Sequence, residues 1–188
     1  LAVILHPHPE YGGTMNNKVV YHAYHTFLKN GFSVCRFNFR GVGKSEGKFD
    51  NGLGELSDAA AALDFIQRNN ANSNESWVVG FSFGALISMQ LLMRRPEIFR
   101  FISISPQPNI FDFNFLAPCP TSGLVIHGDQ DQLVPKDTMI VLKEKLMSQK
   151  NITVDFNEIK SANHFFTGKE KDLVDCIDSY IKKESRLF

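Results

Sequence analysis

Three residues that can carry nucleophilic chemistry follow one another along this chain, and the first is a serine in a glycine-flanked motif. Ser82 is at the centre of Gly80-Phe81-Ser82-Phe83-Gly84, between the apolar run 77–79 and a stretch with helical spacing. Glycines two residues before and after a serine, at a strand-to-helix junction, are typical of a nucleophile elbow. A side chain at either glycine would collide where the helix passes the strand. The motif therefore predicts that the Ser82 hydroxyl is lifted clear of a sheet.

An acid and a base follow the serine, each in a loop after a later apolar run. A serine hydroxyl is a weak nucleophile at neutral pH, and it needs a histidine base that is held in place by an acid. His164 lies in the loop after the last expected strand, and we predict that it is the base. The earlier loop offers two carboxylates. We predict that Asp131 reaches the histidine and that Asp129, closer to the strand end, binds loop backbone N–H groups.

An oxyanion hole for this chemistry needs two backbone N–H donors. Phe83 follows the nucleophile directly and is predicted to supply the first donor. The second should come from the loop after the first strand, His6-Pro7-His8-Pro9-Glu10-Tyr11-Gly12-Gly13. Its prolines have no N–H. His8 is therefore the predicted donor, with Glu10 and Tyr11 as alternatives.

Metal and cofactor chemistry find little support in the same residues. His6 and His8 form a His-x-His pair without a third clustered ligand, which is weak for zinc. We expect no metal, and the proposed chemistry needs no cofactor. Four phenylalanines are candidates either for an apolar acyl pocket or for the core, and these two interpretations stay open. They are Phe111, Phe113, Phe165 and Phe166.

The elements that must position these groups alternate between strand and helix. We predict strands over residues 2–5, 34–39, 77–79, 101–104, 124–126 and 153–159. We predict helices over residues 17–30, 54–68, 85–93, 137–148 and 169–183. The first five strands are nearly continuous apolar runs, as expected for parallel strands covered on both faces. The alternation predicts an α/β fold with a doubly wound, mostly parallel sheet, formed by a single domain over residues 1–188. The irregular stretch 105–120 is either a mobile loop with an aromatic rim or a connection whose phenylalanines pack inward.

Composition excludes several other classes of protein. The 188 residues include 20 basic and 20 acidic side chains, so no charge excess points to nucleic acid or an anionic membrane. No apolar run approaches the length of a membrane span. The three cysteines have neither metal spacing nor the number for a disulfide framework, which favours a cytoplasmic protein with reduced thiols. Leu1 already lies within an expected strand, so we expect that an N-terminal segment is missing. The oligomeric state stays open.

Taken together, the motifs resemble the α/β-hydrolase superfamily, and within it a group of small bacterial hydrolases. The matching segments are His6-Pro7-His8-Pro9, Gly12-Gly13-Thr14-Met15-Asn16-Asn17, Arg36-Phe37-Asn38-Phe39-Arg40-Gly41, Gly80-Phe81-Ser82-Phe83-Gly84 and Ala162-Asn163-His164-Phe165-Phe166. The resemblance implies Ser82 as nucleophile, Asp131 as acid, His164 as base and Phe83 as an oxyanion donor, in the chain order of that superfamily. Two departures are expected: the N-terminal strand pair of relatives is missing, and there is no large cap domain.

These observations lead to one main functional hypothesis and two rivals. The main one is a serine hydrolase that cleaves an ester-like acyl bond of a small-molecule substrate through an acyl-enzyme on Ser82, as a carboxylesterase does. The same three residues would also serve a peptidase or a thioesterase. A rival of another class is a non-catalytic binding module on a hydrolase fold, because a protein can keep a fold without keeping the activity that the fold often carries.

Overall fold

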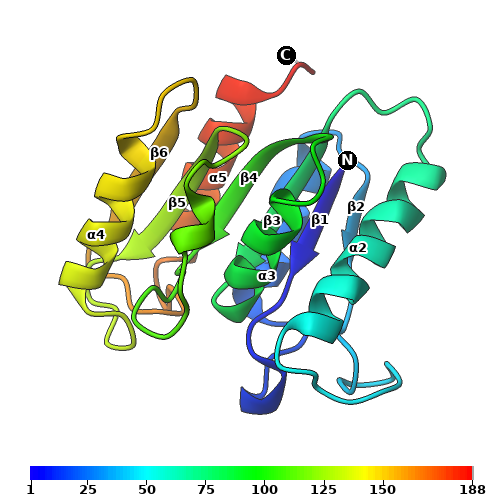
Figure 1. The fold of residues 1–188 in the computed structure, drawn as a ribbon, viewed down its shortest axis with the longest axis horizontal. Helices are drawn as coiled ribbons and strands as arrows, with labels where there is room; N and C mark the ends of the chain where they lie inside the picture. The colour runs from blue at the N-terminus through cyan, green and yellow to red at the C-terminus, as the bar shows by residue number, and fades with distance from the viewer. Residues whose placement is uncertain (188) are drawn as a thin grey trace.

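Six parallel strands form a single sheet at the centre of the molecule. The computed structural model describes residues 1–187, and the order of the strands is β2-β1-β3-β4-β5-β6. The sheet is drawn with its strands roughly vertical in Figure 1. The strands are β1 (Ala2–Leu5), β2 (Val34–Arg36), β3 (Ser76–Phe81), β4 (Ile98–Ile104), β5 (Gly123–Gly128) and β6 (Val154–Ile159). All strands point the same way, so the loops that follow them gather at one edge of the sheet.

Helices cover both faces of this sheet, as a doubly wound fold requires. They are α1 (Lys18–Lys29), α2 (Leu53–Arg68), α3 (Phe83–Leu92), α4 (Lys136–Met147) and α5 (Glu170–Glu184), with short 3-10 turns η1 (Pro9–Tyr11) and η2 (Asn114–Leu116). One buried apolar cluster joins α2, α3 and α4 to the sheet, and a second joins α1 and α5 to its other face. The predicted fold class is therefore confirmed, with a core layer on each side of the sheet.

Two strand boundaries differ from the sequence prediction by three residues, and the other strand boundaries differ by at most two. β2 ends at Arg36 and not at residue 39, because the chain leaves the sheet there and the Phe39 N–H donates to the buried side chain of His6. β4 begins at Ile98, before the predicted start at residue 101, and the register shifts at the Ser76 end of its pairing with β3. Both differences lie at strand ends, where the apolar pattern carries little information.

The connection 105–122, between β4 and β5, packs inward. The side chain of Phe113 is buried, and those of Phe111 and Phe115 are half-buried against the cluster that includes α2, α3 and α4. Of the two interpretations that the sequence left open, the structure supports the inward-packed connection.

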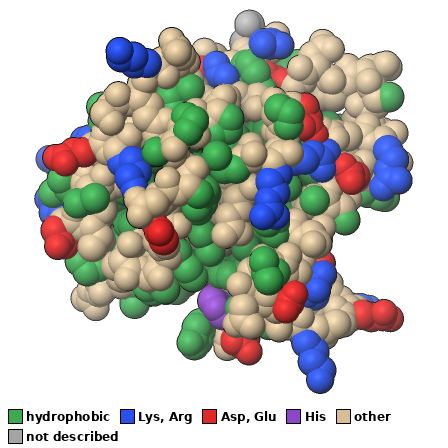
Figure 2. All heavy atoms as spheres, in the orientation of Figure 1, with side chains coloured by type: hydrophobic (Ala, Val, Ile, Leu, Met, Phe, Trp, Pro, Cys, Tyr) green, Lys and Arg blue, Asp and Glu red, His purple; other side chains and the backbone are tan. Residues whose placement is uncertain are grey.

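Basic and acidic side chains are equal in number, 20 of each in the sequence. Figure 2 shows basic and acidic side chains interspersed over one face of the molecule. The cysteines Cys35, Cys119 and Cys176 are all free. No helix within residues 1–187 combines the length and the apolar character that crossing a membrane requires.

The turn from β3 into α3 depends on close backbone contact. A Cβ atom added at Gly84 would lie 2.3 Å from the Leu5 carbonyl oxygen, and one added at Gly80 would lie 2.1 Å from the Gly84 carbonyl oxygen. Real Cβ atoms do not approach backbone this closely, so α3 can cross β1 and β3 here only where side chains are absent.

We expect Gly84→Ala to lower the free energy of unfolding by about 3 kcal/mol, because backbone atoms cannot yield cheaply to the added methyl group. Gly31→Ala is the matched control: Gly31 has φ +82° but open space around its Cβ position, so only backbone strain of about 1 kcal/mol applies. Urea denaturation of the three proteins measures both values. Equal losses in the two variants would contradict the crowding argument.

Candidate active site

The serine, the aspartate and the histidine lie at the same edge of the sheet, although they are far apart in sequence. Ser82 follows β3, Asp131 lies in the loop after β5, and His164 lies in the loop after β6. The Ser82 Oγ is 3.0 Å from the His164 Nε2, and the His164 Nδ1 is 2.6 Å from the Asp131 Oδ2. The three side chains therefore form a continuous chain of hydrogen bonds.

Burial and further hydrogen bonds hold Asp131 and His164 in place. The side chains of Asp131 and His164 are each 4% exposed. The Asp131 Oδ1 accepts the N–H groups of Leu133 and Val134, at 2.8 and 3.1 Å. The Oδ2 is thus left facing the imidazole ring of His164, where it accepts the Nδ1 proton. This tautomer leaves the Nε2 lone pair free to accept a proton from Ser82.

Ser82, the predicted nucleophile, has the strained backbone that its motif predicts. Ser82 has φ 57° and ψ −114°, and its N–H donates to the carbonyl oxygen of Ile104 at 2.9 Å. Positive φ in a non-glycine residue costs free energy and persists only where the surroundings enforce it. Here the enforcing contacts are the crowded glycines and the hydrogen bond to β4.

The loops that carry the acid and the base are tied to each other. The Gln130 N–H donates to the Ala162 carbonyl oxygen at 3.0 Å. Asp129, which was predicted to bind loop backbone, accepts the Ser161 N–H through its Oδ1 at 2.6 Å. Ser105, in the loop after β4, donates its hydroxyl to the backbone carbonyl of His164 at 3.0 Å. His164 is therefore held through its backbone as well as through its ring.

The backbone donors predicted for an oxyanion hole can now be compared. The Glu10 N–H donates to the His8 Nδ1 at 3.2 Å, and the Tyr11 N–H donates to the His8 carbonyl oxygen at 3.1 Å, so both alternatives are already engaged. In the described part of the chain, the N–H groups of Phe83 and His8 have no hydrogen-bond partner. The rings of these two residues lie 4.9 Å apart, and Phe83 begins α3. The unengaged donors are the two that the sequence favoured.

The two histidines of the first loop are bound by protein groups. His6 is fully buried, donates from Nδ1 to the Pro7 carbonyl oxygen at 2.7 Å, and accepts the Phe39 N–H on Nε2 at 3.0 Å. Burial lowers the pKa of His6 to about 4, against the smaller opposing effect of the Pro7 carbonyl. Burial also lowers the pKa of His8. Within residues 1–187, no group of three or more His, Cys, Asp or Glu side chains is placed to hold a metal ion.

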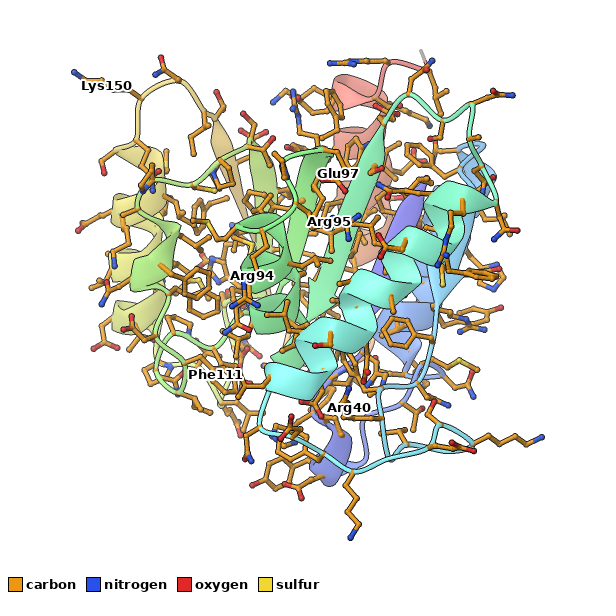
Figure 3. The ribbon with its side chains drawn as sticks, turned by 45° about the vertical axis from the view of Figure 1, so that its right-hand side comes forward. Arg40, Arg94, Arg95, Glu97, Phe111 and Lys150 are labelled. Atoms are coloured by element: carbon orange, nitrogen blue, oxygen red, sulfur yellow. The ribbon has the colours of Figure 1, made fainter. Side chains whose placement is uncertain are left out.

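The four candidate pocket phenylalanines divide into two pairs. Phe113 and Phe166 are 4% and 0% exposed within the two core clusters, so for these two the structure supports the core and not the pocket. The Phe165 side chain is 48% exposed, with its ring 5.1 Å from the His164 ring. Phe111 is half-buried, with its ring 6.1 Å from that of Phe83, and Figure 3 shows it at the same end of the sheet as Arg40. Phe111 and Phe165 remain beside the site.

The sequence analysis missed one side chain that contacts Ser82. The Gln107 Oε1 lies 3.1 Å from the Ser82 Oγ, and Gln107 is only 9% exposed. No motif includes this glutamine. The available signal was its place between two prolines, shortly after a strand that leads to the catalytic edge of the sheet.

Comparisons with known proteins place this geometry in a family. A family model described as Hydrolase_4, serine aminopeptidase S33, matches residues 11–119. An uncharacterized protein of Rickettsia prowazekii (strain Madrid E) is 51% identical over 185 residues, which cover 96% of this chain and 78% of that protein. A crystal structure of a protein of unknown function from Agrobacterium tumefaciens is 54% identical, with a TM-score of 0.94 over 97% of this chain and 84% of that one. A crystal structure from Xanthomonas campestris, described as a member of the α/β serine hydrolases without a lid, is 35% identical, with a TM-score of 0.86 over 97% of this chain and 80% of that one. The chain belongs to the α/β-hydrolase superfamily.

The architecture of this α/β-hydrolase agrees with the relative described as lidless. The connection 105–122, between β4 and β5, contains the short turn η2 and no longer helix among its described residues. The predicted superfamily is confirmed. The predicted fold class, an α/β-hydrolase fold without a large cap domain, is confirmed as well.

The buried neutral His6 should make the stability of this hydrolase depend on pH. An unfolded histidine takes up a proton near pH 6.5, whereas folded His6 does so only near its lowered pKa of about 4. Between these values the unfolded state binds more protons, so the free energy of unfolding falls as the pH falls.

The wild type should lose free energy of unfolding between about pH 7 and about pH 5, and we expect His6→Gln to remove about 2 kcal/mol of that loss. Glutamine cannot titrate but can still accept the Phe39 N–H. Denaturation midpoints at both pH values measure the effect, and an unchanged pH dependence in the variant would contradict it.

Proposed function

We propose that this α/β-hydrolase is a serine hydrolase that cleaves ester-like acyl bonds of small molecules through a covalent acyl-enzyme on Ser82. The observation that carries the proposal is the hydrogen-bonded chain from the Ser82 Oγ through His164 to Asp131, with distances of 3.0 and 2.6 Å. A chain of this kind activates a hydroxyl that is otherwise a weak nucleophile.

In the first half of the proposed reaction, the Ser82 Oγ attacks the acyl carbon while its proton passes to the His164 Nε2. Asp131 stabilises the imidazolium that results. The negative charge on the substrate oxygen is held by the backbone N–H groups of Phe83 and His8. The bond to the leaving alcohol then breaks, and His164 returns the proton to the alcohol oxygen.

In the second half, water takes the place of the alcohol. His164 removes a proton from the water, the resulting hydroxide attacks the acyl carbon, and a second tetrahedral intermediate forms over the same N–H groups. The bond between the acyl carbon and the Ser82 Oγ breaks, and the Oγ recovers its proton from His164. A free acid leaves, and the enzyme is restored.

Exposed apolar side chains around the site support an apolar substrate. Tyr11, Ile110, Leu133 and Phe165 come from four different loops at the catalytic edge of the sheet and are 85%, 60%, 49% and 48% exposed. Each is linked to site residues: Tyr11 packs on His8, Ile110 donates its N–H to the Gln107 carbonyl, Leu133 donates its N–H to Asp131, and Phe165 packs on His164. We define these four as the apolar rim.

Thioester and peptide bonds are the alternatives for the same residues. The matching family model carries the description serine aminopeptidase, which favours the peptidase alternative over the thioesterase. The chemistry of attack is shared, so only substrates distinguish the three. A panel of a p-nitrophenyl ester, an acyl thioester and an aminoacyl anilide with matched acyl groups separates them. The ester proposal requires the largest kcat/KM on the ester.

Ser82→Ala and Asp131→Asn should both abolish or strongly reduce reaction with a reporter-tagged fluorophosphonate and turnover of the ester. We expect no labelling of Ser82→Ala, and a loss of about 10⁴-fold in kcat for Asp131→Asn, because an amide no longer holds the correct histidine tautomer. Asp129→Asn is the matched control in the same loop, because its side-chain oxygen can still accept the Ser161 N–H.

Circular dichroism should show that all three variants are folded. Retained turnover in a clean Ser82→Ala preparation would exclude the acyl-enzyme mechanism. Failure of the folded wild-type protein to react with the probe would favour the non-catalytic binding module.

Phe165→Ala should raise KM for esters with an apolar acyl group by about fivefold while leaving KM for an acetyl ester unchanged. The expected factor corresponds to the loss of about half of a buried aromatic surface. Phe65→Ala is the control, because Phe65 is 60% exposed on α2 and lines the hollow beside β2. Equal changes in the two variants, or in the two substrates, would argue against a role of the apolar rim.

A further inference from the structure

Gln107 places a largely buried amide directly on the proposed nucleophile. Its side chain lies 3.1 Å from the Ser82 Oγ, and Ser82 is also 3.0 Å from the His164 Nε2. The serine hydroxyl therefore has two polar neighbours within hydrogen-bond distance, but it has only one proton to give.

The direction of the hydrogen bond to Gln107 follows from counting protons. The Nδ1 of His164 carries the proton that is shared with Asp131 at 2.6 Å, so a neutral His164 presents a bare lone pair at Nε2. The Ser82 hydroxyl must donate to that lone pair if His164 is to act as its base. An amide oxygen would then face a serine oxygen with no proton between them, which is costly in a buried site. A half-turn of the amide exchanges its oxygen and its NH2 group, which have nearly the same shape, and makes Gln107 the donor.

The backbone around Gln107 is built to hold this position. Pro106 and Pro108 flank the residue. Pro106 has a fixed φ angle of its own, and Pro108 restricts the backbone conformation of Gln107, which precedes it. The Gln107 carbonyl oxygen accepts the N–H groups of Ile110 and Phe111, both at 3.0 Å, which closes the turn that follows.

The same segment is also attached to the nucleophile and to the base. The residue that ends β4, Ile104, accepts the Ser82 N–H at 2.9 Å, and Ser105 donates its hydroxyl to the His164 carbonyl at 3.0 Å. Ser105 has φ 46°, a conformation that non-glycine residues adopt only where neighbours enforce it. Residues 104–107 therefore connect the nucleophile and the base to one short stretch of chain.

We propose that Gln107 is a positioning residue whose Nε2 donates a hydrogen bond to the Ser82 Oγ and directs the serine proton toward His164. The inference rests on the proposed function. One Oγ lone pair is held by the amide, the proton points to His164, and the second lone pair faces the substrate carbonyl. When the acyl-enzyme breaks down, the same N–H stabilises the charge on the departing Oγ until His164 returns the proton.

Two substitutions of similar shape test this role. Gln107→Met keeps the length of the side chain and removes its polar groups, whereas Gln107→Glu keeps an acceptor and removes the donor. The measurement is the rate of phosphonylation by the fluorophosphonate probe as a function of probe concentration. We expect both variants to lower the maximal rate by about tenfold, the size of one lost hydrogen bond, with the half-saturating probe concentration unchanged.

Gln149→Met is the matched control. Gln149 also holds the connection 105–122, through hydrogen bonds to the Leu116 carbonyl and the Cys119 N–H at 2.6 Å each, but it lies at the far end from Ser82. We expect this variant to keep the wild-type maximal rate. If Gln149→Met and Gln107→Met lower the maximal rate of phosphonylation equally, the effect comes only from how well the connection 105–122 is held in place, and the proposal is overturned.

Other outcomes also decide the question. A wild-type or faster rate in Gln107→Met would mean that the amide does not assist Ser82, and a wild-type rate in Gln107→Glu would mean that no donor is needed; either result overturns the proposal. Thermal unfolding establishes that the variants are folded, and Gln107→Leu, which also lacks polar groups, replaces the methionine variant if that one is not. Failure of folded wild-type protein to react overturns the proposed function as well. If the wild type reacts with the probe and both Gln107 variants react at the wild-type maximal rate, the role of Gln107 is overturned and the proposed function stands.

Discussion

Direct contact between the backbone of a helix and the backbones of two strands is the constraint on which the site depends. α3 crosses the ends of β1 and β3 so closely that a Cβ atom at Gly80 or Gly84 would lie within 2.3 Å of a carbonyl oxygen. This crossing forces Ser82 into its strained conformation and directs the first N–H groups of α3 toward the catalytic edge. The backbone contacts fix the position of Ser82, and the other groups of the site are arranged around it.

The sequence predicted this part of the molecule well, because its signals are local. The elbow motif needs only five consecutive residues, and the alternation of apolar runs with helical spacing gave every strand and helix to within a few residues at each end. The pairing of His164 with Asp131 and not with Asp129 could also be predicted, because distance along the loop decides which carboxylate reaches across.

What the sequence left out depends on contacts between distant segments. Phe113 and Phe166 belong to aromatic-rich loops like Phe111 and Phe165, and only packing in three dimensions separates the buried pair from the accessible pair. The contact of Gln107 with Ser82 joins residues 25 positions apart in the chain and has no motif of its own. Beyond the early end of β2, the Phe39 N–H likewise donates to a histidine more than thirty residues earlier in the chain, a contact that no local pattern predicts.

The order of the strands has a consequence for when the chain acquires its chemistry during synthesis. β3, which carries the proposed nucleophile, lies near the middle of the sheet, whereas the proposed base follows β6, which lies at one side of the described sheet and is the last of its six strands to be synthesised. A nascent chain that has folded as far as β5 would hold a strained serine and an acid with nothing to transfer the proton between solvent and substrate. Under the proposed function, reactivity toward acyl compounds would begin only when β6 docks on the sheet, and a chain that has not reached this point would be inert toward them.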